Sequence, residues 1–151
     1  MHGQELSEML LKIDEFLPYR LVKLANKVSS AFSKVYFEEA GLTVPQWRAI
    51  AHLAQQESCS AKQLCDLAEI DKSTMSRAVK QLTDKNWIEL CADPNDKRAK
   101  RLSLTKEGEA LYAQLSPKAL AWENNLLAEL SEQERKALVS VMNKLEKQID
   151  T

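Results

Sequence analysis

Apolar side chains recur at helical spacing in the centre of the chain. From about Lys72, apolar residues follow at i, i+3, i+4 and i+7, while small polar and basic residues occupy the other side. Asp71 is a favourable N-cap, because its carboxylate can accept hydrogen bonds from the free amides of the first turn. Ser60 and Gln63 have the spacing of a capping box for a short preceding helix. The short connection between these two helices is typical of a helix-turn-helix.

Strand periodicity replaces helical spacing after Asn86, a residue type that can take the left-handed position at the end of a helix. Ile88 and Leu90 fall on one face of the next segment. Leu102 and Leu104 mirror them in a returning segment. Turn-forming and basic residues lie between the two segments, which predicts a β-hairpin with a basic tip. A helix-turn-helix followed by such a hairpin is a winged helix.

The N-terminal part of the chain predicts further helices. Residues 5–17 and 21–35 carry apolar residues at helical spacing, and Pro18 predicts a break or kink between them. Gly41 is placed to end the second of these segments. Another helix is predicted over residues 43–56, which begin with a capping box.

Two more helices are predicted after the hairpin. Thr105 is the expected N-cap of the first, which carries several leucines and a predicted kink at Pro117. Ser131 and Glu134 form a last capping box, and the apolar residues of 138–149 follow at near-heptad spacing. These leucine-rich ends exceed what one small winged helix needs for its own core. A second copy of the chain is the simplest partner to cover them.

Composition agrees with a mainly α fold that carries a small β-hairpin wing. The 151 residues are 44% hydrophobic, enough for one compact core, and contain only three glycines and four prolines. No apolar run approaches the length of a membrane-spanning helix, and the N-terminus has no signal-peptide pattern. A cytoplasmic protein without membrane association is therefore expected.

The net charge of −1 conceals an uneven distribution of charge. Residues 71–101 contain eight Lys or Arg against five Asp or Glu, a net +3, which leaves −4 for the rest of the chain. A basic segment on an acidic body favours local attraction to phosphate without general adhesion to polyanions.

A group of central residues forms a recognisable pattern: Ser73 to Arg77 in the second helix, Asp93 to Ala99 in the hairpin, Leu102 to Thr105, and Gly108. In these residues the chain resembles the MarR family of transcription regulators, and with lower specificity the resemblance extends over nearly the whole chain. The resemblance implies one MarR-type domain over residues 1–151. Its dimerisation helices would lie at about 5–40 and 106–150, and its winged helix at about 43–105. It also implies a homodimer that binds a pseudo-palindromic operator, most often as a repressor.

The resemblance also assigns roles to the second helix and to the wing, which together are called the reading elements. The second helix enters the major groove of double-stranded DNA, and the wing arginine, here Arg98, reaches the adjacent minor groove. The wing aspartate, here Asp96, holds that arginine in place. Small hydroxyls permit close approach to a groove, and an arginine can fork onto a guanine edge or a phosphate. The expected DNA contacts are Lys72, Ser73, Thr74, Ser76, Arg77, Lys80, Asp96, Lys97, Arg98, Lys100 and Arg101.

A small-molecule site is expected on the first long helix. Arg20, Lys23 and Lys27 lie at i, i+3 and i+7 and share one face, which suits an anionic ligand. Related regulators respond to aromatic acids or their CoA thioesters, so the predicted effector is an aromatic acid or acyl-CoA. The expected effector contacts are Tyr19, Arg20, Lys23, Trp47 and Arg48. The alternative is a solvated basic face, with the aromatic residues in packing.

Other functions are less well supported by the sequence. It has no phosphate loop, nucleophile elbow or cluster of metal-ligating residues, so neither an enzyme nor a metal or other cofactor is expected. Cys59, Cys65 and Cys91 form no C-x-x-C pair and are interpreted as buried small apolar residues. A redox-responsive regulator acting through a cysteine and a winged helix used only for protein contact remain the alternatives.

Overall fold

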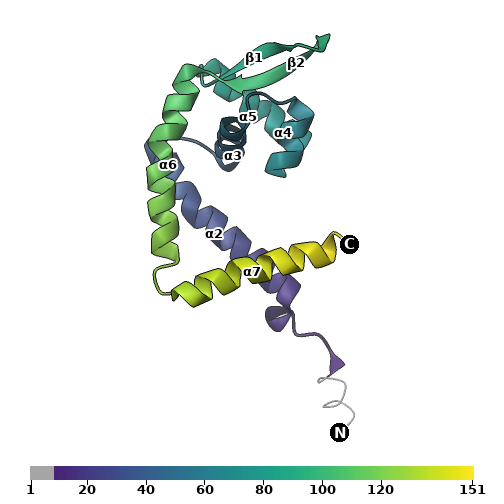
Figure 1. The fold of residues 1–151 in the computed structure, drawn as a ribbon, viewed down its shortest axis with the longest axis vertical. Helices are drawn as coiled ribbons and strands as arrows, with labels where there is room; N and C mark the ends of the chain where they lie inside the picture. The colour runs from purple at the N-terminus through teal and green to yellow at the C-terminus, as the bar shows by residue number, and fades with distance from the viewer. Residues whose placement is uncertain (1–8) are drawn as a thin grey trace. The chain divides into compact units, whose positions relative to one another are not determined.

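The computed structural model describes residues 9–151 and is mainly helical with one hairpin, as predicted (Figure 1). The elements are η1 (Ile13–Glu15), α2 (Leu17–Ala40), α3 (Val44–Gln55), α4 (Ala61–Ala68), α5 (Lys72–Asp84), β1 (Ile88–Asp93), β2 (Asp96–Leu104), α6 (Lys106–Leu126) and α7 (Glu132–Ile149). The chain divides into two compact units, of which the first ends at Tyr112 and the second comprises Ala113–Thr151. None of the helices described is long and apolar enough to span a membrane.

The winged helix in the first unit is built around a buried aliphatic core. Helix α3 packs on α4, α5 and β2, and α5 also contacts β1. Each large side chain buried in this core contributes roughly 1.5–3 kcal/mol relative to an exposed one. The predicted apolar stripe of α5 faces this core. Its side chains that are at most 2% exposed include Ile50, Leu53, Leu64, Met75, Leu82, Ile88 and Leu102.

Local capping interactions fix the ends of these helices. All three predicted capping boxes are present, with the side chains and backbone amides bonded in both directions. Gly41 and Asn86 adopt left-handed φ values of 66° and 63° after α2 and α5, as predicted. The sequence did not predict that Glu69, in the turn between α4 and α5, is also left-handed, with φ of 55°. The left-handed turn at Glu69 connects α4 to α5.

The predicted helix over residues 5–17 is wrong in its described part. Residues 10–12 are not helical, and Ile13–Glu15 form a single 3-10 turn. Phe16 is extended, and α2 begins at Leu17 with Pro18 in its first turn. A proline at this position has no amide to leave unpaired and already has a helical φ, so it starts a new helix. Residues 5–8, which include Leu6 of the predicted stripe, lie outside the described residues.

The wing is an antiparallel pair in which Ile88 pairs with Leu104 and Leu90 with Leu102. Three of these four residues are buried, as the pattern predicts, but Leu90 is 52% exposed. The connection between α3 and α4 adds an isolated β-bridge to β2, at Cys59, that was not predicted. Cys59 donates its amide to the carbonyl of Leu102 at 3.0 Å and accepts the Leu102 amide at 2.7 Å.

Exposed apolar side chains concentrate in the flanking helices. In the first unit they include Leu10, Leu11, Ile13, Leu17, Leu21 and Leu24. In the second unit they include Leu120, Leu126, Leu138, Val141, Met142 and Leu145. Helix α6 is continuous through Pro117 and ends at Leu126, so Leu127 and Leu130 lie in the turn before α7 instead of extending α6 as predicted.

Candidate nucleic-acid interface

The N-terminus of α5 is held by hydrogen bonds to Asp71. Its carboxylate accepts from the Thr74 hydroxyl at 2.7 Å, the Thr74 amide at 3.0 Å and the Ser73 hydroxyl at 2.7 Å. These bonds, those from Thr74 first, hold the pKa of Asp71 well below its ordinary value, so the cap remains ionised at neutral pH. Both hydroxyls donate inward and keep their lone pairs, so at the helix tip they can accept hydrogen bonds.

The outer face of α5 carries basic and small polar side chains opposite the buried stripe. Lys72, Ser76, Arg77 and Lys80 are all exposed. Within residues 9–151, the side chains of Ser76, Arg77 and Lys80 have no hydrogen bond or ion pair. These donors are therefore available to a ligand outside the chain.

Gln46 fixes the position of α5 relative to α3. Its Oε1 accepts the amide of Thr43 at 2.9 Å in the capping box, and its Nε2 donates to Oε1 of Gln81 at 2.7 Å. Gln46 is 7% exposed, so this amide reaches from the core to the polar side of α5. The capping pattern identified the first of these contacts. The second depends on tertiary packing and has no signal in the sequence.

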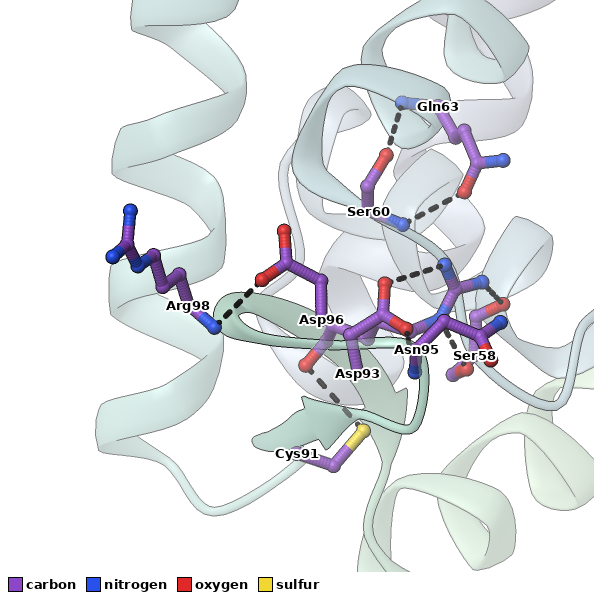
Figure 2. A network of polar contacts seen from close by, with 9 residues as sticks. Ser58, Ser60, Gln63, Cys91, Asp93, Asn95, Asp96 and Arg98 are labelled. Carbon is purple, nitrogen blue, oxygen red and sulfur yellow. Dashed lines mark hydrogen bonds and ion pairs between the residues drawn. The ribbon is translucent and has the colours of Figure 1, made fainter.

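Two carboxylates shape the turn of the wing (Figure 2). Asp93 accepts the amide of Asn95 at 2.8 Å, and Asp96 accepts the amide of Arg98 at 3.0 Å. Asp96 therefore holds the backbone of Arg98 in place. The guanidinium of Arg98 extends away from Asp96 in Figure 2 and is exposed. The guanidinium forms no hydrogen bond or ion pair with any group of residues 9–151.

The remaining basic residues of the wing divide into two groups. Lys97 and Lys100 are exposed like Arg98. Arg101 instead turns toward the connection between α3 and α4, and its side chain is only 24% exposed. Its Nε donates to Oγ of Ser58 and its Nη2 to the carbonyl of Ser58, both at 2.8 Å. The structure thus separates Arg101 from the other predicted DNA contacts. The sequence did not predict Ser58 as a partner of Arg101, because its loop has no periodic pattern.

The residues predicted to bind an effector are not all brought together. Arg20 and Lys23 line a shallow groove of about 460 Å³ beside η1 and the start of α2, with Asp14, Lys27 and three leucines. Tyr19, Trp47 and Arg48 are not part of its lining. Arg48 donates to the carbonyl of Ala68 at 3.3 Å, at the end of α4.

Trp47 belongs to an aromatic cluster that joins α2, α3 and α6. Its ring stacks on Tyr36 at 5.3 Å and on Tyr112 at 6.1 Å between centroids, and Phe32 meets it edge-on at 5.5 Å. Gln55 donates to the Tyr112 hydroxyl at 2.9 Å. Burial raises the pKa of Tyr36. In the first unit, Trp47 therefore packs against other aromatic rings.

The cysteines are free thiols in different environments. Cys59 is 3% exposed and burial raises the pKa of its thiol, while Cys65 and Cys91 are partly exposed. Cys91 donates weakly to the carbonyl of Arg101 at 3.5 Å. In the described part of the chain, no three His, Cys, Asp or Glu residues are grouped to hold a metal ion.

Known proteins share this arrangement. The MarR family model matches residues 40–99. A MarR/EmrR family transcriptional regulator from Acinetobacter sp. ADP1 has a similar solved structure, with 33% identity, a TM-score of 0.81 and coverage of 93% of this chain and 99% of that chain. The HTH-type transcriptional regulator BilQ from Clostridium symbiosum is 26% identical over 116 residues, which cover 77% of this chain and 81% of BilQ.

A third known protein has a similar fold. BpsR from Bordetella bronchiseptica, a protein whose DNA binding is regulated by 6-hydroxynicotinic acid, matches with a TM-score of 0.78 and 23% identity, over 91% of this chain and 97% of that chain. The winged helix, its basic reading elements and the extent of these matches lead to one assignment. The chain belongs to the MarR family of winged helix-turn-helix transcription regulators, which are not enzymes.

Proposed function

We propose that this regulator binds a pseudo-palindromic operator as a homodimer, with α5 in the major groove and the wing in the adjacent minor groove. The observation that carries the proposal is the set of exposed basic side chains on α5 and the wing that have no partner within residues 9–151. Arg77 and Lys80 present donors from α5, and Arg98 presents them from the wing tip. Such donors suit base edges and phosphates, whereas a protein-contact module needs no basic wing. Repression is the proposed mode of action.

The homodimer is supported by the many exposed apolar residues of the flanking helices, since exposed apolar patches mark interaction surfaces. MarR regulators bind DNA as dimers. Two copies of α5 would then face successive major grooves about 34 Å apart. We expect analytical ultracentrifugation at micromolar concentration to find a dimer. A sedimentation profile with monomer alone would contradict the proposal.

The proposed effector is an aromatic carboxylate or its CoA thioester, which releases the DNA. BpsR is regulated by 6-hydroxynicotinic acid, an aromatic acid of this class. In this chain the groove beside α2 combines the cations of Arg20, Lys23 and Lys27 with one carboxylate, that of Asp14, and with apolar leucine side chains. This combination suits a ligand with one anionic and one apolar end.

A panel of aromatic acids and their thioesters tests the effector proposal. At least one compound is expected to raise the melting temperature of the protein and weaken its DNA binding. The double substitution Arg20→Gln with Lys23→Gln should raise the ligand concentration needed for both effects at least about tenfold, because charge-assisted bonds to the ligand are lost. Lys62→Gln, an exposed change on α4, is the control. No response to any compound would refute this effector class.

A further inference from the structure

The wing is attached to the α3–α4 connection by backbone and side-chain contacts at the same place. The backbone of Cys59 pairs with that of Leu102 through two hydrogen bonds. One residue earlier on each segment, Arg101 donates to Oγ and to the carbonyl of Ser58. These contacts join a strand of the wing to the loop that precedes the helix-turn-helix.

The attachment continues from Arg101 to the turn of the wing. Nη1 of Arg101 lies 4.0 Å from Oδ2 of Asp93, whose other oxygen accepts the amide of Asn95. The side chains of Arg101 and Asp93 are 24% and 21% exposed, so solvent screens their attraction only in part. A connected series of contacts therefore runs from Ser58 through Arg101 and Asp93 to the tip that carries Arg98.

A two-stranded ribbon is only marginally stable by itself, so contacts at its base determine where its tip lies. The guanidinium of Arg101 is the group that makes most of these side-chain contacts. Two of its N–H donors bond to Ser58, and its Nη1 lies 4.0 Å from the carboxylate of Asp93, so the guanidinium is directed toward the protein.

We propose that Arg101 is a positioning residue, which holds the wing so that Arg98 reaches the minor groove, and that it does not itself contact DNA. The inference rests on the proposed function of the wing in DNA binding. It reassigns Arg101 from the group of direct contacts that the basic character of the segment suggested.

The chemistry of arginine gives this inference a specific consequence. A guanidinium presents several donors in one plane, so it can serve Ser58 and Asp93 together. A lysine ammonium keeps the charge but is a single point donor and cannot reproduce the arrangement. Arg101→Lys should therefore behave like Arg101→Ala if the role is positioning, whereas lysine should restore most of a phosphate contact.

The test measures operator affinity over a salt series for these two variants, for Arg98→Ala and for the double variant Arg98→Ala with Arg101→Lys. Arg101→Lys is expected to weaken binding roughly tenfold with the salt slope unchanged. In the Arg98→Ala background the same change should cost less than about twofold, because the residue acts through Arg98. Lys100→Ala, an exposed neighbour, is the control and should reduce the salt slope by about one.

Two results would overturn the inference. One is near wild-type affinity for Arg101→Lys together with a shallower salt slope for Arg101→Ala, which indicates a phosphate contact. The other is a loss of binding free energy in the double variant that equals the sum of the losses in Arg98→Ala and Arg101→Lys. Melting temperatures are measured for all proteins, and Ser58→Ala and Asp93→Asn replace the Arg101 variants if these do not fold.

Failure of the proposed function is recognised separately, because wild-type protein would then show no operator preference. In that event hydrogen exchange of the Asn95 and Arg98 amides in the DNA-free protein tests the attachment alone. Faster exchange at both amides in Arg101→Lys than in Lys100→Ala is expected. Equal exchange in the two variants would contradict it.

Discussion

Arg77→Ala and Arg98→Ala are expected to weaken operator binding by about 1–3 kcal/mol per half-site, with different effects on sequence preference. Arg77 lies on the exposed face of α5, where a guanidinium can bond two acceptors on a guanine edge. Its loss should weaken operator binding more than binding to random DNA. Arg98 lies on the wing, where attraction to the minor groove and phosphates depends less on sequence. Its loss should weaken both kinds of binding more evenly.

Fluorescence anisotropy with an operator duplex and a random duplex checks both substitutions. A dimer presents each residue twice, so the measured loss in affinity should approach twice the half-site value. Lys34→Ala, an exposed change on α2, is the matched control and should leave the ratio of the two affinities unchanged. If Arg77→Ala weakened binding to both duplexes equally, the assignment of Arg77 to base reading would be wrong.

Gly108→Ala is expected to destabilise the winged helix by about 1–3 kcal/mol or more. Gly108 lies in the first turn of α6, where an added Cβ would overlap the backbone carbonyl of Trp87 and lie 3.2 Å from a methyl carbon of Leu104. Trp87 is held in place because its carbonyl accepts the amide of Thr105 at 3.1 Å. A backbone group cannot move aside as a flexible side chain would, so α6 or the wing must shift.

The sign of this effect is informative, because helix propensity alone would favour alanine over glycine by about 1 kcal/mol. Thermal unfolding followed by circular dichroism is expected to show a lower melting temperature for Gly108→Ala. Gly41→Ala is the comparison, since Gly41 has a left-handed φ of 66° and open space around it. Alanine at position 41 therefore costs only the strain of a left-handed backbone, about 1–2 kcal/mol. A higher melting temperature for Gly108→Ala would show that the close approach to Trp87 is not maintained.

Features determined by neighbouring residues were predictable from the sequence. The capping boxes, the Asp71 N-cap and the left-handed Asn86 depend on side chains within three or four positions, and the structure has all of them. The stripe on α5 and the hairpin follow from simple periodicity. These local rules were sufficient to place α5 and the wing.

Features determined by tertiary contacts were not predictable. Arg101 resembles its basic neighbours in the sequence, and only the fold brings Ser58 next to it. Trp47 looked like a candidate for ligand binding, but three other aromatic rings pack around it. The apolar spacing before Pro18 suggested a longer helix, yet a proline suited to a first turn starts α2 anew.

The most direct test of the account is the affinity of the wild-type protein for DNA flanking its own gene, against a scrambled duplex of equal length. Fluorescence anisotropy over a salt series provides both the preference and the salt slope. We expect a preference of about a thousandfold or more for the native duplex, with affinity that falls steeply as salt rises. Equal and weak binding to both duplexes at every salt concentration would contradict sequence-specific recognition of that DNA.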